Sequence, residues 1–182
     1  MEFVHVYDVL TQARQRLFDW VRPLSQEQYT QRFPVGPGTL RATLVEIAKV
    51  ELLNTMRLRE EPLPPASTPL PETFPISETR QPTFAELEKA WTAQAKETRA
   101  TLAGTKDWTR AVSRRFEQGD KLVISTASKA DIATQMLMHE VHHRAQAMAM
   151  LRQLGVEAQN LDYISFAARR EEYPKDKAPL DK

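Results

Sequence analysis

The sequence contains four long segments in which apolar residues recur every three or four positions, the spacing of a helix with one buried face. These segments are residues 3–23, 40–59, 84–103 and 129–154. Capping residues precede three of them: Thr39 the second, Thr83 with Glu86 the third, and Ser128 with Asp131 the fourth. Gly104 and Gly155 follow the third and fourth segments, where glycine commonly ends a helix. The pattern therefore predicts four long amphipathic helices.

The connections between these helices differ in kind. Residues 25–28 resemble a capping box and predict one short turn, and residues 33–39 hold two prolines and two glycines, which predicts a loop. Residues 61–82 hold seven of the twelve prolines, so we expect an extended crossover there, which can also wall a site. Two short strands flanking Gly119-Asp120 are expected within residues 114–126.

The order of these elements predicts an all-α fold, a four-helix bundle with one long crossover and a small hairpin before the fourth helix. A further packed segment is expected near residues 161–166, and the polar residues 172–182 read as a flexible tail. No internal repeat or linker divides the chain. We therefore expect a single domain over residues 1–182.

Composition excludes several classes of function. The net charge is +1, so no basic surface for nucleic acid is indicated, and the absence of cysteine excludes disulfides and thiolate metal sites. No apolar run approaches the roughly 20 residues that span a bilayer, and the N-terminal residues do not resemble a signal peptide. We expect a cytoplasmic protein that interacts with neither a membrane nor nucleic acid.

The fourth predicted helix carries three of the four histidines. His139 and His143 are four positions apart, so on a helix they share one face, and they fall within an apolar row that includes Met136 and Ala147. Two buried imidazoles without partners would be costly, whereas one shared cation satisfies both. Glu46 lies at the edge of the apolar face of the second helix. A single glutamate there is usually solvated, but a two-histidine site needs a third ligand.

Residues 139–143 also match HExxH, the zinc protease motif, in which Glu140 would activate water. The extended metzincin form fails, because Gln146 and Ala149 stand where a glycine and a third histidine are required. The sequence also lacks an evident multi-stranded sheet to hold a peptide. A metal-dependent hydrolase is therefore the weaker interpretation, with Glu140 otherwise expected to face away from the metal as an ordinary helix position.

Residues 39–53 and 139–154, followed by Gly155 and then residues 161–166, resemble the DinB/YfiT superfamily of four-helix bundles. In that family the second helix supplies one metal ligand, and the fourth supplies two through an H-x-x-x-H-R-x-Q pattern. His139, His143, Arg144 and Gln146 fall in register with this pattern. The family usually has a histidine on the second helix, where this sequence has Glu46. Glu51 is a weaker substitute, one turn further along and somewhat out of phase.

The resemblance implies a metal-dependent transferase or isomerase that uses a low-molecular-weight thiol, such as bacillithiol or mycothiol, and a small-molecule electrophile. Glu46, His139 and His143 would hold the metal, zinc or nickel first, with manganese or iron as alternatives. Arg144 or His142 are candidates for positioning the substrate, although His142 is expected to be exposed. The resemblance also suggests a homodimer. The alternative is a non-enzymatic, stress-related bundle with a degenerate metal site.

Overall fold

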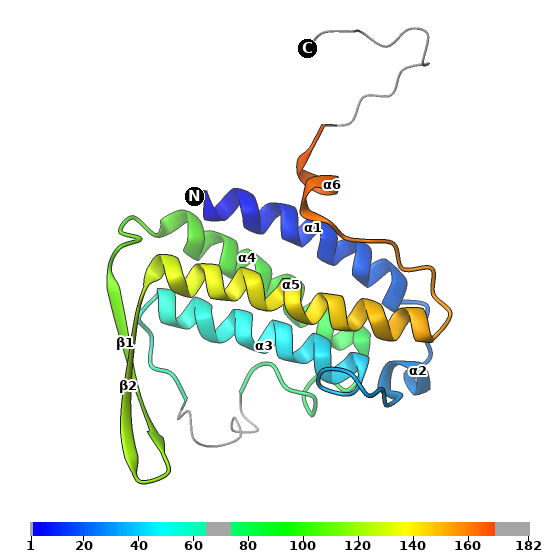
Figure 1. The fold of residues 1–182 in the computed structure, drawn as a ribbon, viewed down its shortest axis with the longest axis horizontal. Coiled ribbons are helices and arrows are strands. Elements are labelled where there is room, and N and C mark those ends of the chain that lie inside the picture. The colour runs from blue at the N-terminus through cyan, green and yellow to red at the C-terminus, as the bar shows by residue number, and fades with distance from the viewer. Residues whose placement is uncertain (1, 65–73, 170–182) are drawn as a thin grey trace, which may run out of the picture.

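The computed structural model describes residues 2–64 and 74–169, which are mainly helical (Figure 1). The four main helices are α1 (Phe3–Val21), α3 (Leu40–Leu58), α4 (Phe84–Gly104) and α5 (Lys129–Gln153). Two short helices, α2 (Gln26–Thr30) and α6 (Tyr163–Ala167), lie in the connections, and a hairpin of β1 (Ala111–Gln118) and β2 (Lys121–Ser128) precedes α5. The prediction of four main helices with a small hairpin before the last is confirmed.

The helices begin where their capping residues predict. The hydroxyl of Thr39 accepts a hydrogen bond from the backbone N–H of Ala42 at the start of α3. Reciprocal side-chain and backbone hydrogen bonds open three other helices: Ser25 with Gln28 in α2, Thr83 with Glu86 in α4, and Ser128 with Asp131 in α5. Each cap satisfies N–H groups that have no partner within the first helical turn.

The two predicted glycine stops behave differently. Gly155 has a φ of +81°, the left-handed conformation that ends α5. Gly104 is instead the last helical residue of α4, and Thr105 after it takes an extended conformation. The prediction that Gly104 stands beyond the helix end is therefore wrong by one position.

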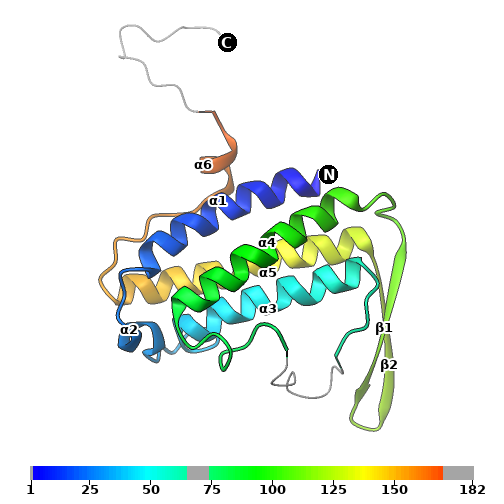
Figure 2. The same ribbon diagram turned by 180° about the vertical axis from the view of Figure 1, so that it is seen from behind.

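The four main helices form a closed ring in the order α1–α4–α3–α5. Helix α5 lies between α1 and α3 on one face (Figure 1), and α4 lies between them on the opposite face (Figure 2). Two apolar clusters fill the interior, one around Leu17, Leu44 and Trp91, the other around Leu10, Leu58 and Ile132. Each helix carries buried polar residues near the boundary between its contributions to the two clusters. These residues form a polar layer across the middle of the core: Arg14, Glu51, Thr98, Glu140 and Arg144.

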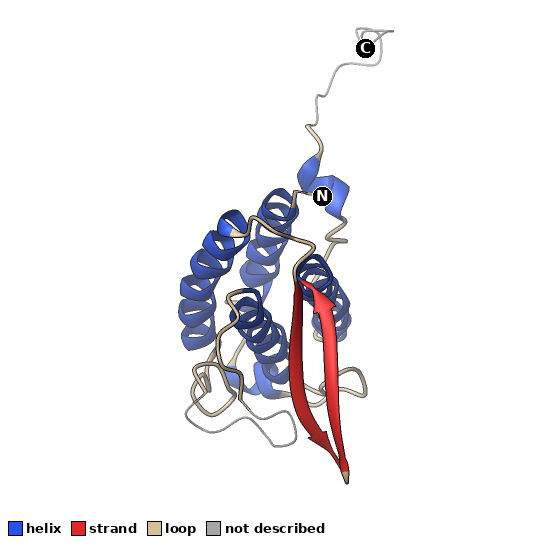
Figure 3. Cartoon of the chain, turned by 90° about the vertical axis from the view of Figure 1, so that its left-hand side faces the viewer, coloured by secondary structure: helices blue, strands red, loops and turns tan. Residues whose placement is uncertain are grey.

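The hairpin extends from the end of the helix ring at which α5 begins (Figure 3). Its strands pair antiparallel from Ala111 opposite Ser128 to Gln118 opposite Lys121, and Gly119 in the turn has a φ of +63°. Both strands are longer than predicted. On the outer face of β2, Leu122 and Ile124 are 65% and 57% exposed.

Part of the predicted crossover and the tail lie outside the described residues. Residues 61–64 and 74–82 contain neither helix nor strand, as expected for the proline-rich connection, and residues 65–73 are not described. The predicted tail, residues 172–182, is likewise not described. Among the described helices, none is both long and apolar enough to cross a membrane.

Candidate functional site

His139 and His143 lie side by side on α5, as predicted. Their ring centroids are 4.4 Å apart, and both side chains are half-buried. Burial, and to a smaller extent the neighbouring His143, lower the pKa of His139 to about 4, while the charge of Glu46 opposes the shift. At neutral pH the His139 imidazole is therefore uncharged and has a nitrogen lone pair to offer. His142 is exposed, as expected.

The side chain of Gln146 links two of the histidines. Its Oε1 lies 2.7 Å from Nδ1 of His143, and its Nε2 lies 3.0 Å from Nε2 of His142. An amide oxygen can only accept, so Nδ1 of His143 carries the proton in this arrangement. Nε2 of His143 is then the unprotonated nitrogen. This is how an outer partner orients a histidine that ligates a metal.

The loop before α3 presses directly against this glutamine. Gly36 has a φ of +52°, and a Cβ added there would lie 2.2 Å from Oε1 of Gln146. Only a glycine fits both the backbone conformation and the close approach. The sequence indicates a loop at residues 33–39, but the contact joins residues more than a hundred positions apart, so no local pattern predicts it.

The third predicted ligand has a different partner. Glu46 is half-buried at the edge of the α3 face, where it was expected, and forms an ion pair with Lys49 one turn away. Within residues 2–64 and 74–169, no three His, Asp or Glu side chains are gathered in a geometry that could hold a metal ion. The donor types fit a divalent ion of the zinc class, and two of them stand together. The Glu46 carboxylate would have to give up its ion pair with Lys49 to bind an ion together with the two histidines.

Glu140 lies in the core and not on the outer face of α5. It is 4% exposed, and its Oε2 accepts a hydrogen bond of 2.5 Å from Nη2 of Arg14, while Oε1 accepts one of 3.1 Å from Nε. The interpretation of Glu140 as an ordinary helix position is therefore wrong. A carboxylate held in this way by a buried arginine is not free to activate water, which argues against the HExxH hydrolase.

Glu51 is also buried, at 3% exposure, so the view that it is out of phase is wrong as well. It accepts hydrogen bonds from four side chains of two helices, α1 and α4. The donors and donor–acceptor distances are Tyr7 Oη at 2.6 Å, Arg14 Nη2 at 2.7 Å, Thr98 Oγ1 at 2.8 Å and Trp91 Nε1 at 2.9 Å. Burial raises the pKa of Tyr7, which keeps its hydroxyl a donor. Glu51 thus joins α1, α3 and α4 at the polar layer.

Arg144, a predicted positioning residue, belongs to the polar layer. Its Nη1 lies 3.8 Å from Oε1 of Glu140, and its Nη2 donates to the backbone oxygen of Leu161 at 3.4 Å. Burial lowers the pKa of Arg144, an effect that Glu140 opposes. Arg144 therefore ties the segment after α5 to the core.

Sequence reasoning missed Arg14, although a charged residue within the apolar row of the first helix was a usable signal.

The sequence matches the model of the DinB family over residues 1–176. The fold is similar to the crystal structure of a DinB family member protein from Shewanella denitrificans, with a TM-score of 0.56 and 18% sequence identity. That alignment covers 94% of this chain and 93% of the other, and at this identity it shows the fold alone. No curated protein matches the sequence. Because the family match spans nearly the whole sequence, the chain belongs to the DinB family.

Proposed function

We propose that this protein is a metal-dependent enzyme that binds a divalent ion between α3 and α5. His139, His143 and Glu46 are the proposed ligands, and zinc or nickel is favoured over manganese or iron by a donor set of two imidazoles and one carboxylate. The observation that carries the proposal is the pair of adjacent, half-buried imidazoles on α5, one of which feels the charge of Glu46 on α3. The proposed reaction is the transfer of a low-molecular-weight thiol, or of water, to a small-molecule electrophile.

The residues of the site have distinct roles in this proposal. A bound divalent ion would lower the pKa of a coordinated thiol or water towards neutrality. His139 supplies an imidazole that is already uncharged at neutral pH, so no proton competes for its nitrogen. Gln146 orients Nε2 of His143, and Glu46 contributes a carboxylate after leaving Lys49. Glu46 also makes the site one charge less positive than three histidines would.

A specific observation favours a second candidate, a non-enzymatic DinB protein with a degenerate metal site. The ammonium group of Lys49 already neutralises the carboxylate that would serve as the third ligand. In that case the histidines and Gln146 would form a hydrogen-bonded cluster with no ion. For either candidate we propose a homodimer, on the family resemblance alone.

Metal content separates the two candidates. The protein is purified without chelator and without a tag, reconstituted with zinc or nickel, and compared with the His139→Ala and His5→Ala variants by elemental analysis. His5 is the matched control, because it lies at the start of α1, away from the cluster. The enzyme proposal expects nearly one ion per chain in the wild type and in His5→Ala, and its loss in His139→Ala. A wild type that stays empty after reconstitution favours the degenerate site.

A third variant tests the role of Glu46. Replacing Lys49 with methionine removes the competing cation and frees the carboxylate. If Glu46 is a ligand, Lys49→Met binds the ion at least as tightly as the wild type. Activity is then measured with bacillithiol or mycothiol and a fluorogenic electrophile. Thiol transfer by the wild type that is absent from His139→Ala supports the proposed reaction, whereas equal rates in both proteins refute it.

A further inference from the structure

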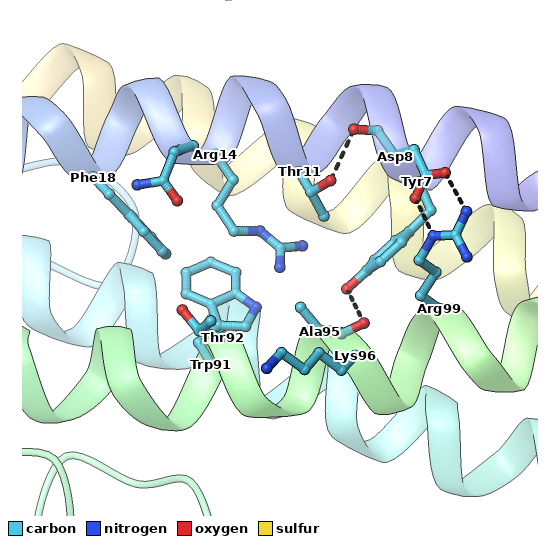
Figure 4. A pocket seen from close by; sticks show the side chains of 11 residues that line it. Tyr7, Asp8, Thr11, Arg14, Phe18, Trp91, Thr92, Ala95, Lys96 and Arg99 are labelled. Carbon is cyan, nitrogen blue, oxygen red and sulfur yellow. Dashed lines mark hydrogen bonds and ion pairs between the residues drawn. The ribbon is translucent and has the colours of Figure 1, made fainter.

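A pocket lies between α1 and α4, across the helix ring from the α3–α5 seam that carries the histidines. Its volume is about 250 Å³. Figure 4 shows side chains of α1 and α4 meeting there, with the guanidinium of Arg14 between the rings of Trp91 and Tyr7. Phe18 and Trp91 make its inner wall apolar, and both are almost fully buried. The pocket shares no residue with the proposed metal site.

Arg14 brings an unused hydrogen-bond donor to this pocket. The side chain is 4% exposed, and its Nε and Nη2 bond to Glu140 and Glu51. Its Nη1 makes no hydrogen bond with any group in the described part of the chain. One face of the guanidinium is covered by the Trp91 ring, whose centroid is 4.3 Å away. This nitrogen is not among the enclosed donors that lack a partner, and Arg14 lines the pocket, so water there can accept its hydrogen bond and a bound acceptor can replace that water.

The charges around the pocket indicate what kind of acceptor fits. The two buried arginines of the polar layer balance its two buried glutamates, so the layer is neutral overall. At the rim, Arg99 is paired with Asp8, whereas Lys96 is exposed and has no ion pair among the described residues. The surplus charge at the mouth is therefore positive. An anionic group is favoured over a neutral acceptor.

We propose that this pocket binds a small aromatic carboxylate. The carboxylate accepts a hydrogen bond from Nη1 of Arg14 and is attracted by Lys96, and the ring packs against Phe18 and Trp91. A volume of about 250 Å³ lies just below the range of roughly 300–1,000 Å³ that holds drug-sized ligands, so a molecule with one ring matches it. The proposal does not depend on the metal site or on any activity there.

Isothermal titration of the full-length protein with 3-phenylpropionate and with its neutral amide, 3-phenylpropanamide, tests the proposal. The protein is treated with a chelator first, because a carboxylate could otherwise bind to a metal at the histidines. A charge-assisted hydrogen bond predicts that the carboxylate binds about tenfold more tightly than the amide. Equal affinities, or no binding of the carboxylate at millimolar concentration, would overturn the proposal.

Surface variants locate the binding without disturbing the polar layer. Lys96→Glu should weaken carboxylate binding at least about threefold, whereas Lys106→Glu, the same charge change beyond the end of α4, should leave it nearly unchanged. Thr92→Trp, at the pocket mouth, should abolish binding, and Ala93→Trp, at the next exposed position, should not. Circular dichroism checks that each variant is folded. If the two variants of either pair change the affinity for the carboxylate equally, the ligand binds elsewhere and the proposal is refuted.

Discussion

Replacing Arg14 with methionine tests whether the polar layer depends on its central cation. The substitution keeps much of the volume of the side chain and removes three hydrogen bonds to carboxylates, of 2.5, 2.7 and 3.1 Å. Glu51 would keep its three neutral donors, Tyr7, Trp91 and Thr98. Glu140 would keep only the more distant Arg144, at 3.8 Å. Both carboxylates would remain in the core with no close cation.

The expected cost follows from this arrangement. Removing one member of a buried ion pair costs about 3–5 kcal/mol, because the remaining charge is neither solvated nor paired. Arg14 serves two carboxylates, so we expect the upper half of that range, about 4–5 kcal/mol. For a protein of this size such a loss lowers the melting temperature by about 10 °C or more.

Urea unfolding at pH 7, followed by circular dichroism, measures this loss. The matched control is Arg22→Met on the same helix, where the arginine pairs with Asp19 and Glu88 and its side chain is 42% exposed. An exposed pair contributes below about 1 kcal/mol, so the control should remain close to the wild type. A loss for Arg14→Met no larger than that of the control would refute the reasoning.

Comparing Arg14→Met with a double variant shows whether the loss of stability comes from uncompensated charge or from altered packing. If uncompensated charge is the cause, adding Glu140→Gln to Arg14→Met removes one of the buried charges and should restore about 1–3 kcal/mol. If the loss reflects only the shape of the side chain, the double variant will be no more stable than Arg14→Met. The midpoints of urea unfolding distinguish these results, provided that the dependence of the unfolding free energy on urea concentration is the same in both variants.

Two further predictions concern the histidine cluster. His139 has an ordinary pKa near 6.5 in the unfolded chain and a pKa of about 4 in the folded protein. The free energy of unfolding should therefore fall as the pH drops from about 6.5 to about 4, because the unfolded chain binds the proton more readily. Because the ring is only half-buried, we expect a loss of about 1–2 kcal/mol in metal-free protein, which His139→Gln should not show in urea titrations at several pH values. Gly36→Ala should push Gln146 away, shift the imidazole nitrogen resonances of His143 and weaken metal binding about tenfold. Gly119→Ala, which has a similar φ but open space around it, should reproduce only the backbone cost; unchanged His143 resonances in Gly36→Ala would contradict the argument.

Local sequence was sufficient to place the helices and the hairpin. A capping box such as Thr83 with Glu86 satisfies backbone groups within four residues, so the information needed to start α4 is contiguous. The hairpin is equally local, because Gly119 supplies the left-handed turn residue between two strands. Gly104 misled the prediction because glycine is also tolerated as the last helical residue, and only the backbone angles decide between the two positions.

The interior of the site was harder to predict, because its partners are distant in sequence. The apolar row on α5 placed His139 and His143 at the centre of the buried face, yet Glu140 and Arg144 are the buried residues. A charge within an apolar row, such as Arg14, signals a residue to inspect, but whether it is buried depends on the opposite charges that pair with it. Arg14 lies 126 positions from Glu140 and 37 from Glu51. Periodicity alone therefore does not identify the partners that allow these charges to be buried.

The polar layer also fixes how the helices align along their axes. Apolar ridges repeat every turn, so two helices can slide by about 5.4 Å and still bury similar surfaces. Such a slide of α3 against α5 would break the bonds from Arg14 to Glu51 or to Glu140, since each requires atoms about 3 Å apart. Glu46 lies five residues before Glu51, and His139 is adjacent to Glu140. Arg14 thus fixes the alignment of α3 and α5 along their axes, and with it the position of Glu46 relative to the histidines, although Arg14 touches none of these three residues.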